Sequence, residues 1–183
     1  MRKCETILFR SNLIYANSNV RRNYKTFKIK GPPKNNIAQN IPHKKFVKYL
    51  GINIDDRLHY KTHIDTQILK VSKTFGHLRR LFYSKILHTK IKIICYQLLI
   101  RSLITYGCPI WYNVSASLME KIRIFERKCL RACLNMNRSS KSDYTKYINN
   151  VKIYNKAGIP RIDNFIIKLI REHFLSDEQN YWK

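Results

Sequence analysis

The chain has 183 residues, of which 44% are hydrophobic, enough for one ordinary domain or for a small subdomain joined to a helical one. Thirty-six Lys and Arg residues against eleven Asp and Glu residues give a formal charge of +25. A surface this positive repels itself unless a polyanion or an acidic surface lies against it, so nucleic acid is the first partner to consider.

Cysteine usage and hydropathy indicate an intracellular protein, in the cytoplasm or the nucleus. No uninterrupted apolar stretch approaches the ~18 residues of a membrane span, and no secretory signal is recognisable, so no membrane partner is expected. The five cysteines are odd in number and lack the paired spacing of a disulfide framework, so free thiols are predicted. They are Cys4, Cys95, Cys108, Cys129 and Cys133.

The first part of the chain has strand character. Residues 5–9, 24–29 and 46–54 alternate partly between apolar and polar side chains, as in a sheet with one buried face. Gly31-Pro32-Pro33 and Asn35-Asn36 are typical turn sequences between them. This pattern predicts three or four short antiparallel strands.

From about Tyr60 the apolar period changes from two to 3.6, which predicts a long helix. Its apolar stripe consists of Ile64, Ile68, Val71, Phe75, Leu78 and Phe82. A second helix is predicted over residues 90–106 and ends at Gly107, with Pro109 two residues on. Its expected inner residues are Ile91, Ile94, Leu98 and Tyr106.

Two further helices follow. One is expected to begin at Ser117, which could form a capping box with Glu120, and its inner stripe is Leu118, Ile122, Phe125, Cys129 and Ala132. A polar loop is predicted over residues 135–143. The last helix is expected near Pro160, with Ile162, Phe165, Ile166, Leu169 and Ile170 inside. The fold class is therefore α+β, a small antiparallel sheet followed by a mainly helical bundle.

Basic side chains lie off the apolar stripes of the first two predicted helices. Such a run is usually a solvated face. Acids are almost missing from the same helices, however, so ion pairs do not account for the bases, and contact with a phosphate backbone is the better explanation. These residues are Lys70, Lys73, Arg79, Arg80, Lys85, Lys90, Lys92 and Arg101.

Several motifs in order resemble one family. The segment Lys48-Tyr49-Leu50-Gly51-Ile52, with Asp55, Leu58 and His63-Ile64, is similar to the palm-to-thumb junction of reverse transcriptases from jockey-type non-LTR retrotransposons. Leu99-Ile100-Arg101 through Tyr106-Gly107-Cys108-Pro109-Ile110-Trp111 resembles the next signature of that family, and Phe125-Glu126-Arg127 the following helix. Lys3-Cys4-Glu5-Thr6-Ile7-Leu8-Phe9 resembles the lysine-bearing strand that closes the palm.

The resemblance implies an organisation and a set of partners. Residues 1–57 would be the end of a palm, a sheet remnant, and residues 58–183 a helical thumb with its following helices. The expected partners are an RNA–DNA hybrid or other nucleic acid, and the upstream fingers, palm and endonuclease regions of a parent polyprotein. Recognition would depend on shape and phosphates because a polymerase must accept every sequence. The nucleic-acid-binding residues would include Lys70, Lys73, Arg79, Arg80 and Arg101.

The resemblance also implies roles for two smaller sites. Tyr49, Leu50 and Gly51 would support the primer end, with Gly51 permitting close backbone approach, although a core-strand role for Tyr49 and Leu50 is an equal alternative. Lys3 matches the palm lysine that protonates departing pyrophosphate, but a solvated strand-end lysine is the preferred interpretation, because a proton donor would have no reaction to serve in this chain.

Catalytic carboxylates are missing from the sequence. Template-directed phosphoryl transfer uses clustered carboxylates to hold two metal ions, and the family's aromatic-x-Asp-Asp segment has no counterpart. Asp55-Asp56 follows Ile54 at a strand end, where Asp commonly serves turns. We therefore expect a polymerase fragment that makes no DNA by itself and needs no cofactor, with Mg²⁺ belonging to the intact enzyme. The alternatives are a domesticated nucleic-acid-binding module and a basic scaffold for acidic proteins.

A metal site is the last hypothesis. Cys129 with Cys133 and His59 with His63 each lie four residues apart, so each pair could share a helix face. Structural zinc sites usually show closer cysteine pairs with spaced histidines, and a helix-face thiol is more often simply buried. The sequence therefore predicts no metal site.

Overall fold

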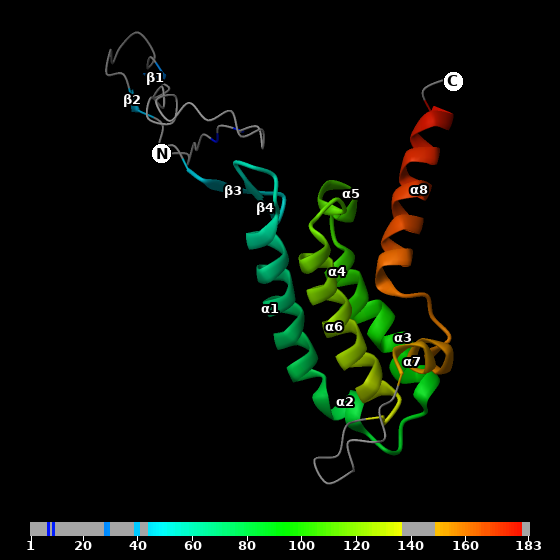
Figure 1. The fold of residues 1–183 in the computed structure, drawn as a ribbon. Coiled ribbons are helices and arrows are strands. Elements are labelled where there is room, and N and C mark those ends of the chain that lie inside the picture. Colours follow the sequence, from blue (N-terminus) through cyan, green and yellow to red (C-terminus); the bar gives the residue numbers. More distant parts are fainter. Residues whose placement is uncertain are drawn as a thin grey trace. The chain divides into compact units, whose positions relative to one another are not determined.

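A computed structural model describes residues 44–136 and 149–180, together with Ile7, Phe9 and the pairs 28–29 and 39–40. The chain divides into two compact units, residues 1–63 and residues 64–183. The described part is mostly helical, with a small amount of antiparallel β-structure (Figure 1). The α+β expectation is confirmed at this level, whereas a palm ending at residue 57 and a thumb beginning at residue 58 stay predictions.

Among its described residues, the first unit contains two short antiparallel ladders. Strand β1 (Lys28–Ile29) pairs with β2 (Gln39–Asn40), and β3 (Phe46–Tyr49) pairs with β4 (Ile52–Asp55). In the second ladder Tyr49 lies opposite Ile52. The predicted strand over residues 5–9, apart from Ile7 and Phe9, and residues 24–27 of the next one lie outside the described residues.

A single strand over residues 46–54 is a wrong prediction, because the chain reverses at Leu50 and Gly51. Their φ angles are 45° and 83°, and a two-residue hairpin loop of the common tight type needs positive φ at both central positions. Gly51 adopts this conformation freely, whereas Leu50 is forced into it. Alternation continues through both strands, so a pattern of period two does not reveal the turn.

The described part of the second unit is built from helices. They are α1 (Lys61–His77), α2 (Arg79–Tyr83), α3 (Thr89–Cys95), the π-helical turn η1 (Tyr96–Arg101), α4 (Ser102–Thr105), α5 (Cys108–Trp111), α6 (Ala116–Cys133), α7 (Asn150–Ala157) and α8 (Ile162–Asn180). The expected end near Gly107 is confirmed, since Gly107 has a φ of 65°.

Helix α6 is the centre of the core and packs against α2, α3, η1, α7 and α8 (Figure 1). Its predicted inner stripe is confirmed: Leu118, Ile122, Phe125, Cys129 and Ala132 are all buried. The stripe of α1 and α2 is confirmed at its buried residues Ile64, Val71, Phe75 and Phe82, and that of α8 at Ile162, Ile166 and Ile170. These helices form because one apolar face is removed from water against α6 or its neighbours.

The predicted inner face of residues 90–106 is wrong. Ile91, Ile94, Leu98 and Tyr106 are between 47% and 67% exposed. The buried apolar residues are Ile93, Tyr96, Ile100 and Ile104. This segment carries apolar side chains on more than one face, and the π-helical turn η1 changes the helical register in its middle, so simple 3.6 periodicity selects the wrong stripe.

The expected capping box at Ser117 is also wrong. Helix α6 begins at Ala116 with Ser115 as its N-cap, and the Glu120 carboxylate accepts hydrogen bonds from Arg123 and Arg127. Of the predicted loop over residues 135–143, only residues 135 and 136 are described.

Helix α7 was not predicted from sequence. The side chain of Asn149 accepts a hydrogen bond from the Val151 amide at 3.1 Å, which caps its N-terminus. Gly158, with a φ of 66°, ends it.

Candidate nucleic-acid interface

Four of the predicted phosphate-binding residues lie on α1 and α2. Lys70 and Lys73 are exposed on α1, and Arg79 and Arg80 are exposed on α2. None of the four forms an ion pair among the described residues. The guanidinium of Arg79 instead lies 5.6 Å from the ring centroid of Tyr83.

The carboxylates of the helical unit whose side chains are described are paired with other Lys and Arg residues. Asp65 accepts from Lys121 at 2.8 Å, and Glu172 lies 3.6 Å from Lys168. The remaining ones with described side chains, Glu120, Glu126 and Asp163, pair with Arg101, Arg123, Arg127 and Arg161. The positive charge of α1 and α2 is therefore left uncompensated by these groups.

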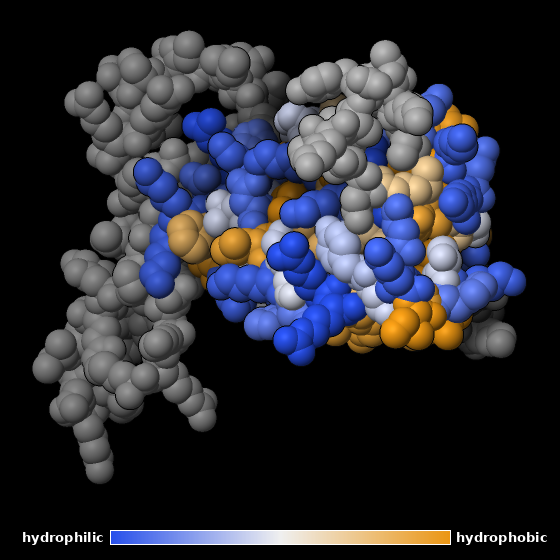
Figure 2. Space-filling model, turned by 90° about the horizontal axis from the view of Figure 1, so that it is seen from below, coloured by the Kyte–Doolittle hydropathy of each residue, from blue (hydrophilic) through white to orange (hydrophobic). Residues whose placement is uncertain are grey.

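The junction of α1 and α2 forms an open hollow of about 640 Å³. Its lining residues are Gly76, His77, Arg79, Arg80 and Tyr83. Figure 2 looks at the molecule from the end where α2 lies in Figure 1, and hydrophilic side chains crowd this face beside smaller hydrophobic patches. Sequence reasoning found the two arginines but missed His77 and Tyr83, although Tyr83 stands one helical turn after Arg79, where side chains meet.

The predicted primer-end residues form the tip of the β3–β4 hairpin. Tyr49 is 63% exposed and Leu50 is 72% exposed, so neither packs into a core as the alternative strand role required. Ile52 is the buried residue of this hairpin. The tip therefore presents an aromatic and an aliphatic side chain on a turn whose backbone is strained at Leu50.

Arg101 is a wrong prediction as a phosphate contact, because its side chain is only 2% exposed. It lies 3.3 Å from the Glu126 carboxylate, donates to the Pro160 carbonyl and has its guanidinium 4.3 Å from the Phe165 ring centroid. Lys92 is likewise buried, and its ammonium donates to the Asn135 side chain at 3.2 Å. Both charges have partners far away in the sequence, which the helical pattern does not reveal.

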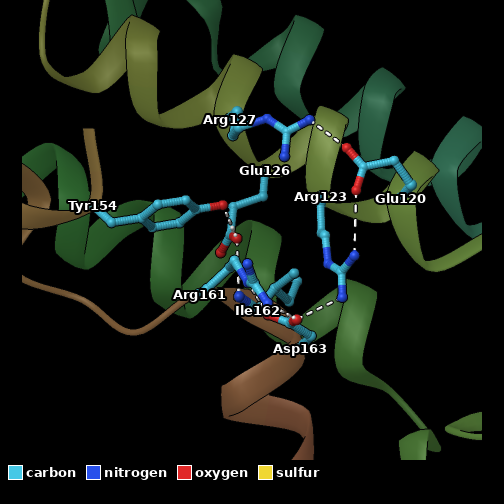
Figure 3. A network of polar contacts seen from close by, with 8 residues as sticks. All are labelled: Glu120, Arg123, Glu126, Arg127, Tyr154, Arg161, Ile162 and Asp163. Carbon is cyan, nitrogen blue, oxygen red and sulfur yellow. Dashed lines mark hydrogen bonds and ion pairs between the residues drawn. The ribbon is translucent and has the colours of Figure 1, made fainter. Parts of the chain in front are cut away.

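Glu126 organises the centre of the helical unit. Its carboxylate accepts hydrogen bonds from the Tyr96 hydroxyl at 3.0 Å, the Tyr154 hydroxyl at 2.8 Å and the Ile162 amide at 2.9 Å, in addition to Arg101 (Figure 3 shows several of these groups). A carboxylate offers about four lone-pair sites, so these donors saturate it. Burial raises the pKa of Glu126, and the bonds to Ile162 and Tyr154 offset this only in part.

A second polar network lies nearby, on α6, on α8 and on the residue that precedes α8 (Figure 3). Arg123 bridges Glu120 at 3.3 Å and Asp163 at 2.6 Å, and Arg161 donates to Asp163 at 2.6 Å and 2.5 Å. Burial raises the pKa of Asp163, but the hydrogen bonds from Arg161 and Arg123 outweigh it, so the net pKa lies below its usual value. These contacts fix α8 on α6 and leave its acids little capacity for outside ligands.

The carboxylate of Asp55 serves a turn, as the sequence predicted. Its two oxygens accept hydrogen bonds from the backbone amides of His59, at 3.0 Å, and Tyr60, at 2.8 Å. These bonds hold a segment in which Leu58 and Tyr60 both have a φ of 56°. Lys3, the candidate general acid, lies outside the described residues.

The two pairs considered for zinc are in different surroundings. Cys129 and Cys133 are buried in α6, and the Cys133 thiol donates to the Lys92 carbonyl at 3.7 Å. Burial raises the pKa of the Cys129 thiol and raises that of Cys133 to about 12, which disfavours the thiolate form that metal binding needs. His59 is exposed, and no group of three or more potential metal ligands comes together among the residues the structure describes.

No protein-family model matches the chain, and no curated protein or solved structure compared with it shows significant similarity. Over the described ranges, no helix combines the length and the apolar character that crossing a bilayer requires.

Proposed function

We propose that this chain is a nucleic-acid-holding portion of an RNA-directed DNA polymerase of the non-LTR retrotransposon type. In this proposal α1 and α2 bind the phosphate backbone of a template–primer hybrid, and the tip of the β3–β4 hairpin supports the primer end. The observation that carries it is the uncompensated charge of Lys70, Lys73, Arg79 and Arg80, because the neighbouring carboxylates neutralise other bases. The order of motifs along the chain resembles that of this family and supports the choice of it.

Some of these residues position the helices, and others bind the nucleic acid. Glu126 and Arg101 are positioning residues that hold η1, α6, α7 and the start of α8 together. The exposed lysine and arginine side chains contact phosphate oxygens. Such contacts fix the orientation of the protein on a duplex without reading its sequence. Each phosphate contact releases counterions, so affinity falls as salt rises.

The salt dependence of binding to an RNA–DNA hybrid tests the proposal. Changing Arg79 and Arg80 together to Gln should flatten the plot of log affinity against log salt by about two, because each lost phosphate contact removes about one unit of slope. The matched control changes Lys168 and Arg171 to Gln, which removes the same charge from the exposed face of α8. Equal slopes for both double variants would show that charge alone, and not this face, drives binding.

Two further assays separate the alternatives. A primer-extension reaction with Mg²⁺ or Mn²⁺ should give no product from these 183 residues, and synthesis would overturn the proposed absence of catalysis. Poly-glutamate should compete poorly with the hybrid at equal charge concentration, because it lacks the spacing of a phosphate backbone. Tighter binding to poly-glutamate would favour the basic scaffold instead.

A further inference from the structure

The hollow at the α1–α2 junction combines three kinds of surface within one small site. His77, Arg79 and Arg80 contribute nitrogen donors, Tyr83 contributes part of an aromatic ring, and Gly76 contributes no side chain. A Cβ added at Gly76 would meet nothing within 4 Å, so there is open space beside this helical residue. The volume, about 640 Å³, lies in the range of small-molecule sites.

The Tyr83 ring packs against aromatic residues of the core. The ring centroid of Phe75 lies 6.3 Å from that of Tyr83 at an interplanar angle of 66°. Phe75 in turn stacks on the buried ring of Phe82, with the two centroids 5.1 Å apart. Arg79 lies 5.6 Å from the centroid of Tyr83, yet 38% of Tyr83 remains exposed. A ring anchored on a core and partly open to solvent can stack on a ligand with little loss of conformational entropy.

The chemistry of the lining selects a ligand. No carboxylate lines the hollow, and neither Arg79 nor Arg80 forms an ion pair in the described part of the chain, so the site favours an anion. Beside the cations, an exposed aromatic ring favours a flat π surface. Phosphate with a free base face is the chemistry of a nucleotide outside a duplex, because base pairing and stacking hide those faces.

We infer that this hollow binds an unpaired nucleotide of a single-stranded segment, with its phosphate on Arg79 and Arg80 and its base stacked on Tyr83. Lys73 lies four residues before His77 and Lys70 lies seven before it, so the basic stripe continues along α1 in steps of about 4.5–6 Å. Such a stripe suits the successive phosphates of a strand better than a free nucleotide. This inference rests on the proposed function in placing nucleic acid on α1 and α2, and it adds a single-stranded segment to the hybrid proposed there.

The test compares three ligands by fluorescence anisotropy: a ten-nucleotide oligo-uridine, an abasic oligomer of the same length, and an RNA–DNA hybrid. Tyr83→Leu should weaken oligo-uridine binding by about 5-fold to about 150-fold, the loss expected for one stacked base. Binding of the abasic oligomer and of the hybrid should stay unchanged. Tyr83→Phe should retain binding, and Tyr112→Leu, a change at an exposed tyrosine on another part of the unit, should have no effect.

A second variant guards against a folding defect. Gly76→Leu fills open space beside the hollow while replacing a helical glycine with a better helix former, so the thermal midpoint should hold or rise while oligo-uridine binding falls. Equal losses for the oligo-uridine and the abasic oligomer in Tyr83→Leu, or no loss at all, would overturn the stacking role. Uridine monophosphate competing as tightly as the oligomer would overturn the assignment to a strand.

The two proposals fail in different ways. An unchanged salt slope for hybrid binding after loss of Arg79 and Arg80 refutes the proposed function. A Tyr83 variant that binds every ligand normally refutes only the single-strand site.

Discussion

Glu126 and Glu120 lie on the same helix in contrasting surroundings. Glu126 is fully buried against Arg101, whereas the Glu120 side chain is 44% exposed and pairs with Arg123 and Arg127. Removing one partner of a buried pair leaves an uncompensated charge, while exposed pairs contribute little.

Glu126→Gln should therefore lower the free energy of unfolding by about 3–5 kcal/mol, because Arg101 stays buried opposite a neutral amide. Glu120→Gln is the control and should cost less than about 1 kcal/mol. Urea unfolding at pH 7 measures both. Similar losses for the two variants would mean that Arg101 finds water or another acceptor when Glu126 is changed.

Asp163 predicts a pH dependence. Its pKa in the folded protein lies below the unfolded value of about 3.9, so its stabilising contribution is present above that pH and is lost as the pH falls through the folded pKa. Asp163→Asn should cost about 1.5–3 kcal/mol at pH 7, and the gap from the unchanged protein should close toward pH 2.

The control for this titration is Asp65→Asn, because Asp65 is 45% exposed and its ion-pair partner in the described part of the chain is the exposed Lys121. Its effect should be small at every pH. Comparing urea unfolding of each variant with the unchanged protein at each pH removes the contribution of Glu126, whose raised pKa acts in the opposite direction. A gap for Asp163→Asn that is equal at pH 7 and pH 2 would contradict the role of its ionised form.

At the scale of elements, two neighbouring isoleucines of α3 offer a matched test of the observed helix face. Ile93 is 7% exposed and Ile94 is 52% exposed. Ile93→Ala should cost about 2–5 kcal/mol through lost burial and a cavity, and Ile94→Ala less than about 1 kcal/mol. Thermal or urea unfolding decides between this face and the one expected from sequence, for which the order would reverse.

The β3–β4 hairpin predicts a gain of stability with a loss of binding. Leu50→Asn places the preferred Asn-Gly pair at a turn where both φ angles are positive, so the hairpin should gain about 1 kcal/mol, measured by amide exchange over residues 46–55. If the Leu50 side chain supports the primer end, affinity for a template–primer should fall in the same variant. Unchanged affinity would remove this tip from the binding surface.

The 3.6-residue apolar period predicted the buried face correctly for those helices that carry a single apolar stripe. The inner faces of α1 and α6 follow directly from residues such as Val71 and Ile122, because one face is apolar and the other is charged. The segment before Gly107 is apolar on several faces, so only the packed structure shows that Ile93 and Tyr96 are inside. A register change at η1 has no sequence marker in this chain.

The candidate site was predicted only where exposure follows from the helix face. Arg79 and Arg80 lie off the stripe and are exposed, as expected, whereas Arg101 also lies off the predicted stripe yet is buried. Its burial depends on Glu126, 25 residues further along, and on the Pro160 carbonyl. Such long-range compensation is invisible to a local pattern, and so is the hollow that Tyr83 completes.

At the scale of the whole molecule, the net charge of +25 predicts two opposite responses to salt. Raising NaCl from 50 to 500 mM shortens the distance over which charges interact from more than about 10 Å to less than about 10 Å. The thermal midpoint should therefore rise, because repulsion between the positive charges weakens. The same change should weaken hybrid binding steeply. Calorimetry and anisotropy on one preparation measure both, and a midpoint that falls with salt would show that attractive ion pairs outweigh repulsion.

The four donors around Glu126 couple η1, α6, α7 and the start of α8 through one buried carboxylate. Tyr96 and Arg101 come from η1, Tyr154 from α7, and the Ile162 amide from the first residue of α8. A shortened chain ending before residue 149 would keep Glu126 but lose two of the four donors that stabilise its buried carboxylate, the Tyr154 hydroxyl and the Ile162 amide. Unfolding of residues 64–183 should accordingly be all-or-none, with amides of α6 and α8 exchanging at a common rate.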